Sequence, residues 1–142
     1  MHKYTVELRF SSKVVDLNKI SSFLNIEPRE IFYIKKRNKL DSSKPTQIWA
    51  YSGTDEIDYR FEWDSLQEGL EFLFKKLQSK KAKIVELSNE FNGIWWCGHF
   101  QSSFDGGPRL TADFLAELAS YKIPLYLDNY FSSDDDSEDS IE

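Results

Sequence analysis

A cysteine and a histidine share one side of the most apolar stretch in the chain, residues 93–101. The stretch reads Gly-Ile-Trp-Trp-Cys-Gly-His-Phe-Gln, and as a strand it points Trp95, Cys97 and His99 to the same side. A thiol beside an imidazole is the arrangement of a Cys–His nucleophile, and both groups are also zinc ligands. One hypothesis is therefore a small enzyme that uses Cys97 and His99, with Asp105 as a third residue.

The rest of the chain gives that chemistry little support. A zinc site needs three or four ligands, but the only other histidine is His2 and there is no second cysteine. No oxyanion hole is evident near the pair, and a free cysteine is among the residue types most often buried. We therefore interpret Cys97 and His99 as packing residues, and expect no catalytic residue, no metal site and no cofactor.

The elements that would position these side chains follow from hydrophobic periodicity. Alternation of polar and apolar residues predicts strands at residues 4–10, 30–36, 47–52, 57–63, 93–101 and 123–130, with a hairpin over residues 47–63. Helical spacing predicts helices at residues 17–24, after a Ser65 cap, at residues 81–91 and after a Thr111 cap. This order predicts an α+β fold, a ferredoxin-like sandwich whose mixed, mostly antiparallel sheet has helices packed on one face.

The functional interpretation depends on which side of each strand meets the helices. On residues 93–101 we assign Ile94, Trp96 and Phe100 to the helix-covered core. The other strand faces then carry an aromatic set, namely Trp49, Tyr51, Trp95, Tyr126 and Tyr130. Such a set forms a partner-binding surface if it is exposed, and a second core if helices cover it.

Charge separates the end of the chain from the rest. Residues 1–131 are expected to form a single domain. Residues 132–142 are expected to be a disordered tail, because six of these eleven residues are acidic and only Ile141 is apolar. The tail carboxylates could steer a basic partner into contact. Its candidate binding residues are Asp134, Asp135, Asp136, Glu138 and Asp139.

Composition also bears on partners and compartment. The net charge of −6 argues against nucleic-acid binding, although the basic run at residues 35–39 is where a nucleic acid would bind. No apolar run approaches the roughly 20 residues of a membrane helix, so we expect no membrane partner. A single cysteine fits a reducing compartment, and we expect a cytoplasmic protein.

Several segments together resemble a bacterial family, the domain of unknown function family 4279. They are Tyr-Thr-Val-Glu-Leu-Arg-Phe at residues 4–10, the helix that ends in Phe-Leu-Asn-Ile-Glu-Pro, the Gln-Ile-Trp-Ala-Tyr-Ser strand after a basic loop, the Ser-Leu-Gln-Glu-Gly-Leu helix, and the closing residues 110–121 and 123–130. The resemblance covers most of residues 4–130, but the run at residues 57–63 and the acidic tail depart from it. Some relatives look like immunity proteins paired with secreted toxins, so the resemblance implies binding and neutralisation of a toxin domain.

Three hypotheses follow for the function. The first is a non-enzymatic, cytoplasmic protein-binding module, an immunity protein that binds and occludes a cognate toxin domain. We expect that toxin domain to be basic, for example a nuclease. The alternative is a structural or regulatory domain that forms a homo-oligomer through an exposed aromatic sheet face. The third is the small enzyme that uses Cys97 and His99.

Overall fold

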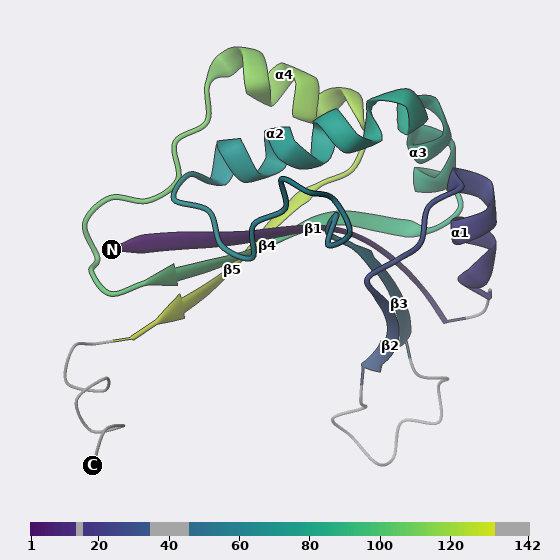
Figure 1. Ribbon diagram of the computed structural model, residues 1–142, viewed down its shortest axis with the longest axis horizontal. Helices are drawn as coiled ribbons and strands as arrows, with labels where there is room; N and C mark the ends of the chain where they lie inside the picture. The colour runs from purple at the N-terminus through teal and green to yellow at the C-terminus, as the bar shows by residue number, and fades with distance from the viewer. Residues whose placement is uncertain (14–15, 35–45, 133–142) are drawn as a thin grey trace.

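The computed structural model describes residues 1–13, 16–34 and 46–132 of the chain. The described strands are β1 (His2–Ser12), β2 (Glu30–Ile34), β3 (Thr46–Tyr51), β4 (Asn92–Gln101) and β5 (Leu125–Phe131). The described helices are α1 (Asn18–Leu24), α2 (Leu66–Leu77), α3 (Lys81–Ser88) and α4 (Ala112–Ser120), and a 3₁₀ turn, Gln78–Lys80, joins α2 to α3. All four helices lie on the same side of one sheet (Figure 1).

The sheet confirms the predicted α+β sandwich and has the strand order β2-β3-β1-β4-β5. β1 is antiparallel to both β3 and β4, and β2 is antiparallel to β3. α1 connects β1 to β2, and β3 lies between these two strands in the sheet. α2 and α3 connect β3 to β4, and β1 lies between these two strands. These two interleaved units are the split βαβ arrangement of ferredoxin-like folds. α4 then crosses back to β5, which pairs in parallel with β4.

The helix ends follow from local sequence. The Ser65 hydroxyl accepts a hydrogen bond from the Glu68 backbone N–H at 3.2 Å, and the Thr111 hydroxyl does the same for Phe114 at 3.2 Å. Both predicted caps are therefore confirmed. α1 ends at Asn25, whose φ of 54° lies in the left-handed region that asparagine tolerates.

Aromatic side chains fill the layer between the helices and the sheet. Phe74 of α2 lies at its centre, with its ring centroid 5.1 Å from that of Trp95 and 4.8 Å from that of Tyr121. Phe114 of α4 stacks on the Phe74 ring, with the two centroids 5.2 Å apart. β1 contributes Leu8 and Phe10, which are fully buried. Because each buried ring removes on the order of 150–250 Å² from water, this layer supplies most of the hydrophobic stabilisation.

The strand predicted at residues 57–63 is wrong, and so is the hairpin that included it. Residues 52–65 form a loop in which only Trp63 makes a sheet-like contact, an isolated bridge to Tyr4. Lys76 of α2 binds Asp58 at 2.8 Å and Glu56 at 3.5 Å, and these ion pairs hold the loop against the helix. The aromatic and charged residues that alternate at 57–63 therefore make the contacts of a loop, such as Trp63 with Tyr4 and Asp58 with Lys76. They do not form the two faces of a strand.

Candidate functional site on the uncovered sheet face

The structure reverses the predicted faces of β3 and β4. Trp95, Cys97 and His99 point into the helix layer and are buried, whereas Trp96 and the partly exposed Phe100 lie on the other side. Trp49 is also fully buried, and its indole N–H donates to Ser21 Oγ of α1 at 3.0 Å. Alternation identifies the residues that share a face, but it does not say which face the helices will cover.

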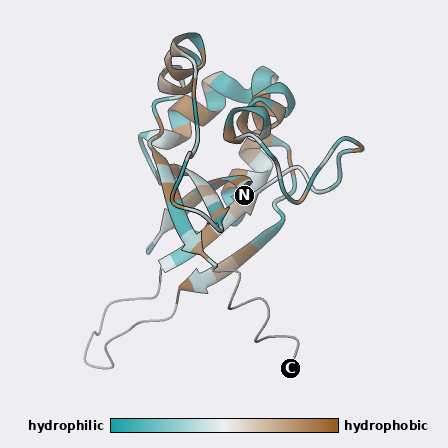
Figure 2. Ribbon diagram, turned by 90° about the vertical axis from the view of Figure 1, so that its left-hand side faces the viewer, coloured by the Kyte–Doolittle hydropathy of each residue, from teal (hydrophilic) through white to brown (hydrophobic). Residues whose placement is uncertain are grey.

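Three residues predicted to bind a partner are therefore core residues: Trp49, Tyr51 and Trp95. Ile94, Trp96 and Phe100, which were assigned to the helix layer, lie instead on the side of the sheet that no described helix covers (Figures 1 and 2). We call this side the open face. The remaining candidate residues in the acidic tail, and the basic run at residues 35–39, lie outside the described residues.

Tyr126 and Tyr130 of β5 do lie on the open face. The register places Tyr126 beside Trp96 and Tyr130 beside Phe100. Tyr126 is 53% exposed, and the rings of Phe100 and Tyr130 stack with centroids 4.9 Å apart. The Tyr130 hydroxyl donates to Asp128 Oδ2 at 2.6 Å, a hydrogen bond that raises the pKa of the phenol. These four rings lie on one face of the neighbouring strands β4 and β5 and form an aromatic strip along them.

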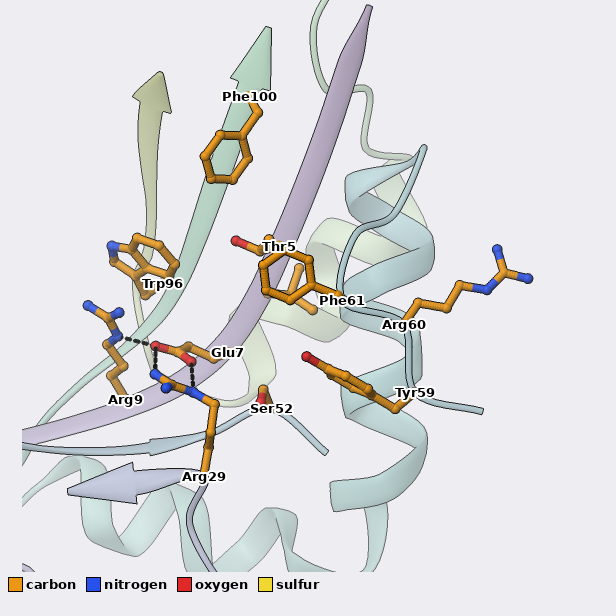
Figure 3. Close-up of a pocket in the computed structure, with 11 residues that line it drawn as sticks. Thr5, Glu7, Arg9, Arg29, Ser52, Tyr59, Arg60, Phe61, Trp96 and Phe100 are labelled. Atoms are coloured by element: carbon orange, nitrogen blue, oxygen red, sulfur yellow. Dashed lines mark hydrogen bonds and ion pairs between the residues drawn. The ribbon is translucent and has the colours of Figure 1, made fainter. Parts of the chain in front are cut away.

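A buried carboxylate lies next to this strip. Glu7 of β1 is directly opposite Trp96 and is only 5% exposed, although it is on the open face. Its Oε1 accepts from Arg9 Nε at 2.5 Å, and its Oε2 accepts from Arg29 Nε at 3.1 Å (Figure 3). A buried carboxylate is tolerated when it is paired and hydrogen-bonded in this way. Glu7 therefore fixes the positions of two guanidinium groups.

The two arginines are held differently. Arg29 also donates to Glu30. Partial burial by itself lowers the Arg29 pKa, but the hydrogen bonds and charges of Glu7 and Glu30 outweigh it and raise the pKa, so Arg29 stays protonated. Arg9 instead has its Cζ over the Trp96 ring, 4.0 Å from the ring centroid, and 5.4 Å from the centroid of the Phe32 ring. Such stacking restricts a guanidinium and leaves its outer edge free to bind.

A pocket of about 290 Å³ opens between this ion cluster and the loop at residues 52–65. Tyr59 and the 70% exposed Phe61 form its loop side, and Trp96 and Phe100 form its sheet side (Figure 3). Its full lining is Thr5, Val6, Glu7, Arg9, Arg29, Ser52, Tyr59, Arg60, Phe61, Trp96 and Phe100. The pocket thus combines aromatic walls with charged groups that are already in place.

Cys97 and His99, two residues of the enzyme hypothesis, are both buried. Burial raises the pKa of the Cys97 thiol to about 12, so the thiol is neutral at physiological pH. His99 Nδ1 lies 2.8 Å from Asn129 Oδ1, and His99 Nε2 lies 2.8 Å from His2 Nδ1. His2 in turn donates to the backbone carbonyl of Asp105, not to its carboxylate. The described residues contain no group of three side chains that could hold a metal ion.

Sequence reasoning missed the ion cluster and the pocket. One signal was available, because Glu7 and Arg9 are opposite charges two residues apart on the polar side of a strand. Their burial depends on Arg29 and on the loop at residues 52–65, which are distant in sequence. Only the fold brings these segments together.

The chain matches a known family over almost its whole length. The model of a domain of unknown function (DUF4279) matches residues 2–132. No curated protein and no solved structure matches the chain. Within the described residues, no helix has the length and apolar character needed to cross a membrane.

Proposed function

The chain belongs to the DUF4279 family, and we propose that it is a protein-binding module that docks its partner on the open face of the sheet. The observation that supports this proposal is the exposure of Phe100, Tyr126 and Tyr130 beside the stacked Arg9–Trp96 pair. Aromatic side chains and arginine are the residue types that most often dominate binding energy at protein interfaces. Exposed apolar rings gathered on one face of a domain mark such an interface.

In its specific form, the proposal is a cytoplasmic immunity protein that occludes a cognate toxin domain. The family resemblance supports this form, and so does the net charge of −6, which favours attraction of a basic toxin domain such as a nuclease. The acidic residues 134–139 would speed the encounter, and the open face would supply the buried contacts on which affinity depends. No chemistry is asked of this chain, because covering the toxin's active site is sufficient.

The test is protection of cells against a toxin domain encoded beside this gene. Wild-type chain should restore growth, and the purified pair should form a complex by calorimetry. The double variant Phe100→Asp, Tyr126→Asp should lose protection and bind at least about 100-fold more weakly, because it places two charges in the interface. Leu115→Asp is the matched control, since Leu115 is 45% exposed but lies on α4 in the helix layer. Equal binding by the double variant and the control would contradict the proposal.

Self-association is a second candidate function, which the position of β5 favours. β5 is at the end of the sheet, and Tyr126 and Tyr130 project from it onto the open face. Two copies could therefore meet through these rings. Sedimentation should then show a dimer in the wild type and a monomer in Phe100→Asp, Tyr126→Asp. A wild-type monomer at all accessible concentrations would contradict this candidate.

A further inference from the structure

We infer that the pocket between the Glu7 ion cluster and the loop at residues 52–65 binds a carboxylate side chain of the protein partner. The inference rests on the proposed function, because it names what the partner presents to one part of the open face. The acidic contact that it predicts is opposite in sign to the basic partner surface that the charge of the chain as a whole favours. The partner would then carry at least one acidic residue within its contact region.

Arg9 provides the donors. Its Nε is used by Glu7, but its two terminal nitrogens donate to no acceptor among the described residues. The side chain is only 18% exposed, so these N–H groups have limited access to water. The contact of Cζ with the Trp96 ring and the hydrogen bond from Nε to Glu7 together restrict the guanidinium. A fixed guanidinium with a free edge matches the two oxygens of a carboxylate through paired hydrogen bonds.

Ser52 is a second, independent feature of the same pocket. It is 6% exposed, and its hydroxyl has no hydrogen-bond partner in the described structure. Figure 3 shows Ser52 between Arg29 and the Tyr59 ring. Buried hydroxyl groups are nearly always hydrogen-bonded, because an unpaired one carries a desolvation penalty. A ligand in the pocket that brings oxygen acceptors would remove this penalty.

The charges around the pocket favour a single anionic group. Arg9 and Arg29 with Glu7 give the cluster side of the pocket a net charge of +1, opposite in sign to the −6 of the chain, and the third lining arginine, Arg60, points its guanidinium away. A cationic ligand would be repelled by these arginines. Arg29 already donates to Glu7 and Glu30, so the two terminal nitrogens of Arg9 are the pair of donors that remains. One guanidinium edge, with two donors and a single positive charge, matches a carboxylate better than a doubly charged phosphate group.

The volume of the pocket and its walls limit the size of the partner group that it can hold. A volume of about 290 Å³ corresponds to roughly ten water molecules, enough for an acidic side chain and one neighbouring apolar group. Phe61 offers an apolar wall from a loop that is held at Trp63 by two backbone hydrogen bonds to Tyr4, of 2.7 and 2.8 Å. The wall is therefore in place before the ligand arrives, which lowers the entropy cost of binding.

A pair of small probes tests the pocket without the partner. N-acetylphenylalanine carries an aromatic ring and a carboxylate, and N-acetylphenylalaninamide is its neutral counterpart. In an NMR titration of the full chain, the acid should shift the Trp96 indole and Ser52 amide signals with a Kd in the millimolar range. The amide should bind about 10-fold more weakly. Equal binding of the two probes, or binding of neither, overturns the inference.

Two substitutions at Arg9 and one control complete the test. Arg9→Gln removes both the charge and the paired donors and should abolish the preference for the acid, whereas Arg9→Lys keeps the charge without the paired donors and should reduce the preference. Arg60→Gln is the matched control. Arg60 lines the same pocket, but its guanidinium points away from the cluster and lies 5.4 Å from the Trp63 ring (Figure 3). An undiminished preference in either variant, with folding confirmed by the spectrum, overturns the assignment to Arg9.

The partner complex separates this inference from the proposed function. Loss of partner binding in Phe100→Asp, Tyr126→Asp but not in Arg9→Gln overturns the inference and leaves the docking face in place. Partner binding that none of these substitutions changes overturns the proposed function. In that case acid-selective binding of the probe still supports an anion pocket, but no longer one filled by a partner's side chain.

Discussion

The two sides of one sheet use the same residue types for opposite purposes. Trp95 and Trp96 are adjacent in β4, yet Trp95 is fully buried between Phe74 and Tyr121, whereas Trp96 supports the guanidinium of Arg9 on the open face. On the covered side, rings pack on rings and contribute stability. On the open side, the Trp96 ring lies beside the charged groups of Arg9 and Glu7. Coverage by helices, and not aromatic content, therefore distinguishes the core from the open face.

The largest difference between the faces should appear when the adjacent tryptophans are truncated. Trp95→Ala leaves a cavity in the helix layer and should cost about 3–5 kcal/mol of unfolding free energy. Trp96→Ala removes a ring that solvent partly reaches, and should cost no more than about 1–2 kcal/mol. Urea unfolding of both variants measures the two values. Equal losses would mean that the open face is covered in solution.

The next largest effect concerns the charge buried on the open face. Glu7→Gln leaves Arg9 and Arg29 without their shared carboxylate and should cost about 2–3 kcal/mol. Glu30→Gln is the control, because Glu30 is half exposed and binds only Arg29, so it should cost less than about 1 kcal/mol. The readout is again urea unfolding. A cost for Glu7→Gln as small as the control would show that water replaces the ion cluster.

Alkaline pH should act mainly through the covered side. Burial, with a smaller contribution from the charge of Glu7, raises the pKa of Cys97 from 9.0 to about 12. Because the folded-state pKa is the higher one, the stabilisation is complete below about pH 9 and is lost as the pH rises toward 12. Between about pH 8 and 10.5 this group should lower the unfolding free energy by about 2 kcal/mol.

Cys97→Ala isolates the contribution of the thiol to that loss. The variant should lose about 2 kcal/mol less than the wild type over the same pH interval, measured by urea unfolding at both ends. Tyr51, whose pKa burial also raises to about 12, remains in both proteins, and its contribution therefore cancels. Identical pH slopes in the two proteins would mean that the thiol reaches solvent.

The smallest effect on stability should come from Tyr126, one of the rings that the proposed function places in the interface. Tyr126→Ala removes a side chain that is more than half exposed on β5, so the unfolding free energy should change by less than about 0.5 kcal/mol. Its partner affinity should nevertheless fall by about 10-fold or more. Calorimetry of the complex measures the second value. A large stability loss with unchanged affinity would reverse the roles assigned to the two faces.

The sequence was sufficient to predict the element types and most of the fold. Caps at Ser65 and Thr111, the apolar stripe of α2 and the alternation in β1 are local signals, and the structure confirms them. The α+β class followed from their order. The false strand at residues 57–63 shows the limit of such signals, since Lys76 is about fifteen residues away and its ion pairs decide the path of the loop.

The candidate site could be predicted only in part. Tyr126 and Tyr130 were placed on the open face, because the β5 face that contacts the core also carries Leu125 and Leu127. β3 and β4 carry apolar residues on both sides, so alternation gives no preference between the faces, and the prediction that Trp49, Tyr51 and Trp95 lie on the uncovered face is wrong. Glu7 and Arg9 could not be recognised as buried, because their burial requires Arg29 and the loop at residues 52–65.

The position of β1 at the centre of the sheet has a consequence for how the chain is made. Its ladder with β4 pairs His2 with Gln101, about a hundred residues further along the chain. At 5–20 residues per second, a ribosome leaves β1 without this neighbour for on the order of ten seconds. During that interval Leu8 and Phe10 cannot be covered on a completed sheet. The nascent chain is therefore most prone to aggregation just before β4 emerges, and chaperone binding at that stage should determine its yield.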